Sequence, residues 1–157
     1  MVRLDTAASA SDLELVRTLF QEYADSLGVD LAYQGFEEEV NRLPGESSPP
    51  AGTLLLARTG DALIGCVGVR PLDERTAEMK RLYVRPSGRG LGLGRSLAEA
   101  AIRFAVAAGY ERMRLDTLPQ MGRAQELYRS LGFMPIDAYR FSPVPGTAFL
   151  ELLLTEG

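Results

Sequence analysis

Hydrophobic residues recur along this chain with two different spacings. In four segments they return every three or four positions, which is the spacing of one face of an α-helix. These segments are residues 11–27, 36–43, 93–109 and 121–131. The first opens with the capping-box pattern Ser11-x-x-Glu14 and is followed by Gly28. We therefore predict a helix that begins at Ser11 and ends before Gly28.

Other segments alternate apolar and polar residues or form short apolar runs, as β-strands do. They are residues 2–6, 53–58, 62–70, 78–84, 112–118, 133–140 and 148–154. A turn at 59–61 joins two of them into a hairpin, and residues 78–84 add a third antiparallel strand. From residue 78 to residue 118 the order strand, helix, strand predicts a right-handed parallel crossover.

The Pro-, Gly- and Ser-rich residues 44–52 predict a mobile loop, not a domain linker, because too little chain precedes them to form a core. A chain of 157 residues is then one domain, residues 1–157. Its net charge of −4 argues against a general nucleic-acid binder, which needs surplus cations. The sequence shows no apolar run of membrane-spanning length and no signal-peptide core, so we expect a cytoplasmic protein without membrane partners.

The sequence contains no histidine and one cysteine, which excludes several kinds of chemistry. Ser–His and Cys–His nucleophilic machinery and His-based zinc sites cannot form within this chain. Cys66 lies in an apolar run, which favours a small buried residue over a nucleophile. We expect no metal, and a general base must be a carboxylate, a lysine, a tyrosine or water.

A glycine-rich stretch lies between the strand at 78–84 and the helix that follows it. Glycines let a backbone approach a ligand closely, and the free N–H groups at a helix start attract anions. The stretch contains Gly88, Gly90, Gly92 and Gly94, with Arg89 and Arg95 as phosphate-binding candidates. The spacing fits neither a P-loop nor the dinucleotide fingerprint, which argues against a nucleotide-binding protein.

The pattern Arg-x-x-Gly-x-Gly at residues 89–94, behind Leu-Tyr-Val-Arg-Pro, resembles the GNAT superfamily of N-acetyltransferases. The resemblance implies an α/β (α+β) fold with a mixed, mostly antiparallel sheet of six to seven strands, in the order βααββββαβαββ. It also implies acetyl-CoA as cosubstrate, with its pyrophosphate in the glycine-rich loop. The residues expected at the cofactor are Leu82, Tyr83, Val84, Arg89, Gly90, Leu91, Gly92, Leu93, Gly94, Arg95 and Ser96.

Residues 127–133, Leu-Tyr-Arg-Ser-Leu-Gly-Phe, are similar to a second signature of this superfamily. By that resemblance Tyr128 lies near the thioester sulfur as general acid; the alternative is a tyrosine at the edge of the core. A tyrosine pKa of about 10 exceeds the value of about 8.5 for a thiol, so a hydrogen bond to the thiolate is easier than full proton transfer. Met121 stands where many relatives carry an asparagine that contacts the pantetheine.

The resemblance also places a carboxylate in the strand at 78–84 as general base, which here is Glu78. Strand alternation puts Glu78, Lys80, Leu82 and Val84 on one face, and a glutamate that is paired with Lys80 or simply solvated is an equal alternative. A backbone N–H near Leu82, where relatives often have a bulge, is expected to bind the acetyl oxygen.

The acceptor pocket of such enzymes is usually formed by the N-terminal helices. The charge run there could be an acidic rim for a cationic amine or only a solvated helix face. Arginines could equally bind the carboxylate of an amino-acid-like acceptor. The residues concerned are Tyr23, Tyr33, Phe36 and Glu37, Glu38 and Glu39, and the arginines are Arg70, Arg114 and Arg140.

The sequence thus predicts an enzyme, an acetyl-CoA-dependent N-acetyltransferase. It would move an acetyl group directly to a primary amine of a small metabolite or amino-acid-like acceptor. The alternatives are a protein or peptide N-acetyltransferase and a non-catalytic acyl-CoA sensor. Because many relatives dimerise, a homodimer is a further expectation.

Overall fold

The computed structural model describes residues 2–28 and 30–154, and within them every side chain except that of Tyr33. The described strands form one seven-stranded sheet in the order β1-β2-β3-β4-β5-β7-β6. All neighbours are antiparallel except β4 and β5, which are parallel. The strands are β1 (Val2–Thr6), β2 (Thr53–Thr59), β3 (Ala62–Pro71), β4 (Thr76–Val84), β5 (Arg112–Thr117), β6 (Met134–Ile136) and β7 (Ala148–Leu153).

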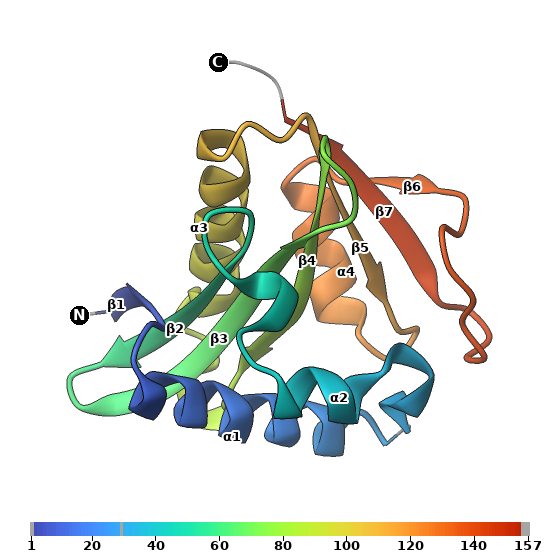
Figure 1. The fold of residues 1–157 in the computed structure, drawn as a ribbon. Coiled ribbons are helices and arrows are strands. Elements are labelled where there is room, and N and C mark those ends of the chain that lie inside the picture. Colours follow the sequence, from blue (N-terminus) through green and yellow to red (C-terminus); the bar gives the residue numbers. More distant parts are fainter. Residues whose placement is uncertain (1, 29, 155–157) are drawn as a thin grey trace.

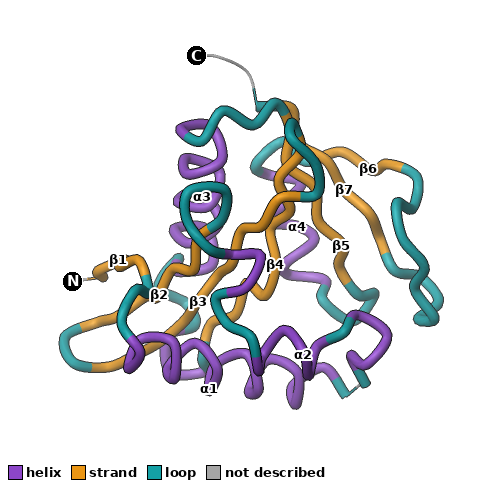
Figure 2. The backbone as a smooth tube through the Cα atoms, viewed as in Figure 1, coloured by secondary structure: helices purple, strands orange, loops and turns teal. Residues whose placement is uncertain are grey.

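Helices cover both faces of the sheet, as Figure 1 shows. One apolar cluster joins the sheet to α3 and α4, and a second joins it to α1 and α2. The helices are α1 (Ala10–Leu27), α2 (Phe36–Asn41), α3 (Leu93–Ala107) and α4 (Gly122–Ser130), with short 3₁₀ turns η1 (Leu31–Gln34), η2 (Gly45–Ser47) and η3 (Pro86–Gly88). This arrangement confirms the predicted α/β fold, and Figure 2 shows the same path as a tube. None of the described helices is long and apolar enough to cross a membrane.

The start of α1 differs from the prediction. Ser9, not Ser11, is the N-cap: its hydroxyl accepts from the Asp12 N–H, and the Asp12 side chain accepts from the Ser9 N–H. The cap therefore lies two residues earlier than expected, and the helix begins at Ala10. Its end is as predicted, because Gly28 adopts a left-handed conformation with φ of 67°.

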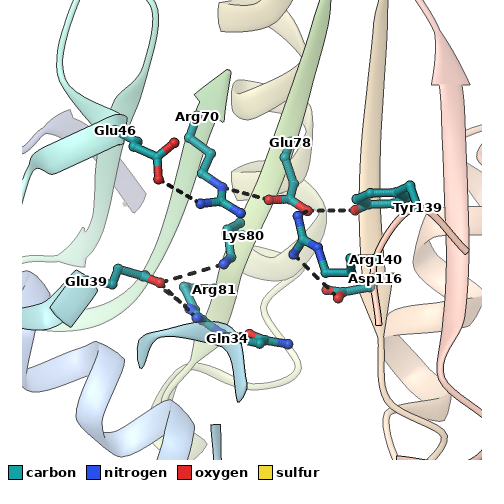
Figure 3. A network of polar contacts seen from close by, with 10 residues as sticks. All are labelled: Gln34, Glu39, Glu46, Arg70, Glu78, Lys80, Arg81, Asp116, Tyr139 and Arg140. Carbon is teal, nitrogen blue, oxygen red and sulfur yellow. Dashed lines mark hydrogen bonds and ion pairs between the residues drawn. The ribbon is translucent and has the colours of Figure 1, made fainter. Parts of the chain in front are cut away.

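Two other details differ from the prediction. Three strands, not four, separate α2 from α3 in the described chain, because a turn of four residues directly links β3 to β4. The strand predicted at 133–140 covers only Met134–Ile136. Beyond it the chain leaves the sheet, and Tyr139 and Arg140 point inward to a carboxylate of β4 (Figure 3).

β4 carries the bulge that relatives led us to expect. Its pairing with β3 runs through Gly68↔Lys80 and then Cys66↔Tyr83, so two β4 residues oppose one β3 residue. Arg81 lies at this point with φ of 60°, a backbone conformation that residues other than glycine rarely adopt. From Leu82 onward, the extra residue reverses which face of the sheet each β4 side chain points to.

Consequently Leu82 packs on the α3 side of the sheet, as Val84 does, whereas Tyr83 packs on the α1 side. The prediction that Leu82 and Val84 share a face with Glu78 and Lys80 was therefore wrong, because alternation assumes an unbroken strand.

Candidate active site

β4 and β5 separate part-way along their length. They pair only from Thr76↔Arg112 to Glu78↔Arg114 among the described residues, and the strands then splay apart (Figure 1). The splay leaves a cavity of about 20 Å³, which we call the junction cavity. It is lined by Tyr23, Leu27, Leu31, Gln34, Met79, Lys80, Arg81, Leu82, Asp116, Thr117, Leu118, Met121 and Tyr128.

The junction cavity lies between two larger spaces. The first, the cofactor groove, has a volume of about 870 Å³ and shares Tyr23, Leu27, Leu82 and Met121 with the cavity. The second, the side pocket, has a volume of about 370 Å³. It shares Gln34 and Lys80 with the cavity. A molecule in the groove and a molecule in the pocket can therefore meet at the junction cavity.

The cofactor groove runs along the glycine-rich loop to the start of α3. Gly90 and Gly92 have φ of 85° and 71°, and no side chain caps the first turn of α3. The first N–H groups of the helix are thus left for an anion. A Cβ on Gly88 would lie 2.9 Å from Leu93 Cδ1, so this position requires glycine to bring the loop close to the helix. These features fit the pyrophosphate of a CoA ester.

Eight of the eleven predicted cofactor residues line the groove. They are Leu82, Tyr83, Val84, Arg89, Gly90, Gly92, Leu93 and Gly94. The other three do not line it: Leu91 is 60% exposed, Arg95 donates to Ser130 Oγ at 2.6 Å, and Ser96 Oγ donates to the Gly92 carbonyl at 3.1 Å. Contact of each residue with acetyl-CoA stays a prediction.

Arg81 anchors the bulge to the N-terminal helices. Its guanidinium is buried, donates two hydrogen bonds to the Glu39 carboxylate at 2.8 and 3.1 Å, and donates a third to Gln34 Oε1 at 2.7 Å (Figure 3). It also lies over the rings of Tyr23 and Phe36, at 5.9 and 5.2 Å from their centres. These contacts fix the geometry of the bulge. Glu39 and Phe36 contribute to it directly, because both contact Arg81.

Both carboxylate oxygens of Glu78 are occupied. Oε1 accepts from Arg70 Nε at 2.7 Å, and Oε2 accepts from the Tyr139 hydroxyl and from Arg140, each at 2.6 Å (Figure 3). Burial would raise the pKa of the Glu78 carboxyl, but the charges of Lys80, Arg70 and Arg140 hold it below its usual value. Glu78 lines none of the three spaces described above.

Three buried polar side-chain atoms of the described chain have no hydrogen-bond partner: Lys80 Nζ, Asp116 Oδ2 and Thr117 Oγ1. All three residues line the junction cavity. Lys80 Nζ lies 3.6 Å from Glu39 Oε1, and Asp116 Oδ2 lies 3.7 Å from Arg140, both too far for a hydrogen bond. Because buried polar groups are nearly always paired, these atoms are candidates to bind a water molecule or the polar groups of a ligand.

Burial shifts the protonation equilibria around the cavity. It lowers the pKa of Lys80 to about 8, with the neighbouring charge of Arg81 acting in the same direction. It raises the pKa of the Asp116 carboxyl, so this carboxylate holds a proton more readily than an ordinary aspartate. It also raises the pKa of the Tyr128 hydroxyl, which stays protonated and able to donate. Cys66 is buried, and burial raises the pKa of its thiol, so it remains an inert core residue.

Comparison with known proteins agrees with this geometry. Residues 14–133 match the sequence pattern of the Acetyltransferase (GNAT) family. The chain belongs to this family. An uncharacterized N-acetyltransferase of Schizosaccharomyces pombe is 39% identical over 92% of this chain and 90% of its own length.

Two further GNAT relatives bear on the ligands. The structure of yncA from Salmonella typhimurium, a putative acetyltransferase solved with its cofactor acetyl-CoA, covers 99% of this chain and 95% of its own, with a TM-score of 0.70 and 22% identity. The human N-acetylaspartate synthetase is 31% identical over 62% of this chain and 33% of its own length. This GNAT chain is thus an acyltransferase of a family that uses acetyl-CoA.

Sequence reasoning assigned no role to Arg81 or Asp116 and treated Lys80 only as a partner of Glu78. The sequence offers no signal that separates them from the other charged residues of the same strands, such as Glu78 and Arg114. Of the predicted acceptor residues, Glu39 lines the side pocket while Glu37 lies on the opposite side of α2, beside α1. The side chain of Tyr33 lies outside the described part of the structure.

Proposed function

We propose that this GNAT protein transfers the acetyl group of acetyl-CoA directly to the primary amine of a small acceptor. The observation that carries the proposal is the junction cavity, where the cofactor groove and the side pocket meet. A pocket of about 370 Å³ suits a small molecule better than a protein segment. The name of the human relative, N-acetylaspartate synthetase, is consistent with an amino-acid-like acceptor.

Acetyl-CoA supplies a thioester whose carbonyl carbon an amine can attack. The β4 bulge leaves backbone groups at Arg81 and Leu82 outside the ladder with β3, so the Leu82 N–H can donate to the acetyl oxygen. The Tyr128 hydroxyl, from a residue that lines the junction cavity, donates to the departing thiolate. A C–N bond forms, the C–S bond breaks, and the amine loses one proton.

We assign the removal of that proton to Asp116. Asp116 lines the junction cavity, its Oδ2 accepts no hydrogen bond within the described chain, and the pKa of its carboxyl is raised, all of which suit a base. Glu78, the base that the sequence suggested, has neither property. We propose instead that Glu78 is a positioning residue, because it holds Arg140, which in turn lies beside Asp116.

The test is release of CoA across a panel of small amines and short peptides, with acetyl-CoA binding measured in parallel. Removing a general base costs roughly 10²–10⁴-fold in rate, so we expect this loss in kcat for Asp116→Asn. Asp116→Asn should also remove the acidic limb that Asp116 adds to the pH profile of kcat/KM, whereas Glu78→Gln should keep it. The opposite pattern would return the role of base to Glu78.

Tyr128→Phe should lower kcat while leaving acetyl-CoA binding intact. Turnover of peptides but not of small amines would favour a protein N-acetyltransferase. Binding of acetyl-CoA without turnover of any amine would favour the alternative function, a non-catalytic acyl-CoA sensor. A cytoplasmic location and a homodimer stay predictions.

A further inference from the structure

We propose that Lys80 binds a carboxylate of the acceptor, so that the acceptors are amines with a carboxylate close to the amine, as in α-amino acids. This inference rests on the proposed acetyl transfer and names its substrate class. It starts from the unpartnered atoms of the junction cavity.

The arginines that the sequence offered as carboxylate ligands are all engaged by the protein itself. Arg70 donates to Glu78 and Glu46, Arg114 donates to Glu151, and Arg140 pairs with Glu78 and Asp116. Arg81 is likewise saturated by Glu39 and Gln34. Lys80 is the buried cation of the described chain whose charged atom donates no hydrogen bond, and its side chain is only 7% exposed.

The nearest anion does not satisfy Lys80. Glu39 Oε1 lies 3.6 Å from Lys80 Nζ, and the same oxygen already accepts from Arg81 at 2.8 Å (Figure 3). One carboxylate thus faces two cations, and Lys80 Nζ donates no hydrogen bond to it. A buried ammonium in this state attracts an anionic group, and a carboxylate would accept hydrogen bonds from it.

The position of Lys80 matches a role in orienting an acceptor. It lines both the side pocket and the junction cavity, so it lies at their boundary. Asp116, with its free Oδ2, lines the cavity but not the side pocket. A carboxylate bound at Lys80 would thus direct the adjacent amine inward to Asp116 and leave the rest of the acceptor in the side pocket. An amino acid bound in this way would give both Lys80 Nζ and Asp116 Oδ2 a hydrogen-bond partner.

The experiment compares amino acids with their own carboxamides as acceptors, using wild type and two variants. Each pair has the same side chain and differs in the negative charge. Amidation lowers the pKa of the α-amine, which favours the amide, so a preference for the acid cannot come from amine ionisation. Lys80→Met removes the charge at nearly constant length. Arg103→Met is the matched control, because Arg103 is an exposed cation of α3 that lines neither the side pocket nor the junction cavity.

For the best acid we expect kcat/KM to exceed that of its amide by about 10- to 100-fold, the factor that a charged hydrogen bond contributes. Lys80→Met should bring the ratio close to one, while Arg103→Met should keep it. The wild-type comparison does not depend on the folding of any variant.

Equal use of acid and amide by wild type would overturn the inference but leave the proposed acetyl transfer standing. A preference for acids that survives in Lys80→Met would overturn the assignment to Lys80. Failure of every amine, despite acetyl-CoA binding, would instead overturn the proposed function.

Discussion

Replacing Lys80 by methionine should make the protein more stable at neutral pH. The lysine is buried, and its pKa falls from 10.5 to about 8. At 1.36 kcal/mol for each pKa unit, keeping it charged in the folded state costs about 3 kcal/mol. Methionine carries no charge and has a similar length, so Lys80→Met should gain about this amount at pH 7.

The gain should depend on pH in a defined way. Between about pH 8 and 10.5 the unfolded chain holds a proton on Lys80 that the folded chain has lost, so wild-type stability rises with pH in this window. Below pH 8 Lys80 keeps its proton in the folded chain, so the full cost of about 3 kcal/mol applies. The charges that act on Lys80 are those of Arg81, Glu39, Arg70 and Glu78, and Glu39 keeps its bonds to Arg81 in the variant. The difference between the two proteins should therefore shrink toward zero by pH 10.5.

The measurement is urea unfolding of both proteins at several pH values from 6.5 to 10. Far-UV circular dichroism is the suitable signal, because the chain contains no tryptophan. Arg103→Met is the control and should change stability by less than about 0.5 kcal/mol, as exposed substitutions do. A Lys80→Met protein less stable than wild type at pH 7, or a difference that does not vary with pH, would refute the claim that this ammonium lacks a partner.

Three further outcomes follow from the contacts described above. Arg81→Met removes both hydrogen bonds that Arg81 donates to the Glu39 carboxylate, and should lower the free energy of unfolding in urea by about 3 kcal/mol; an unchanged midpoint would contradict the anchoring role of Arg81. Ser9→Ala removes the α1 cap and should cost about 1 kcal/mol, whereas Ser11→Ala should cost less. With an amino acid as acceptor, KM should rise above about pH 8 as Lys80 loses its proton, and this rise should be absent in Lys80→Met.

The sequence predicts most elements of this fold because hydrophobic spacing is a local property. The start of α1 shows the limit of that approach. Ser9 with Asp12 and Ser11 with Glu14 both satisfy the capping-box spacing, and only the folded helix shows that the first pair forms it.

The bulge at Arg81 has no local signal, since it arises from the pairing of β4 with β3. The charge network is equally non-local: Arg81 meets Glu39 from 42 positions away, and Tyr139 reaches Glu78 from 61 positions away. Sequence patterns could find the glycine-rich loop and Tyr128 because each lies within one short motif. They could not show that Glu78 is saturated while Lys80 and Asp116 are left unpartnered.

The separation of the two larger spaces has a consequence for how this enzyme can diversify. Among the described residues, the side pocket and the cofactor groove share no lining residue. The side pocket draws most of its wall from residues 34–47, whereas the groove draws on the end of β4, the glycine-rich loop and the start of α4. Gln34 and Glu39 also hold Arg81, but residues 42–47 contact neither Arg81 nor the groove. Under the proposed function, substitutions at 42–47 would therefore alter acceptor choice while the donor site stays the same.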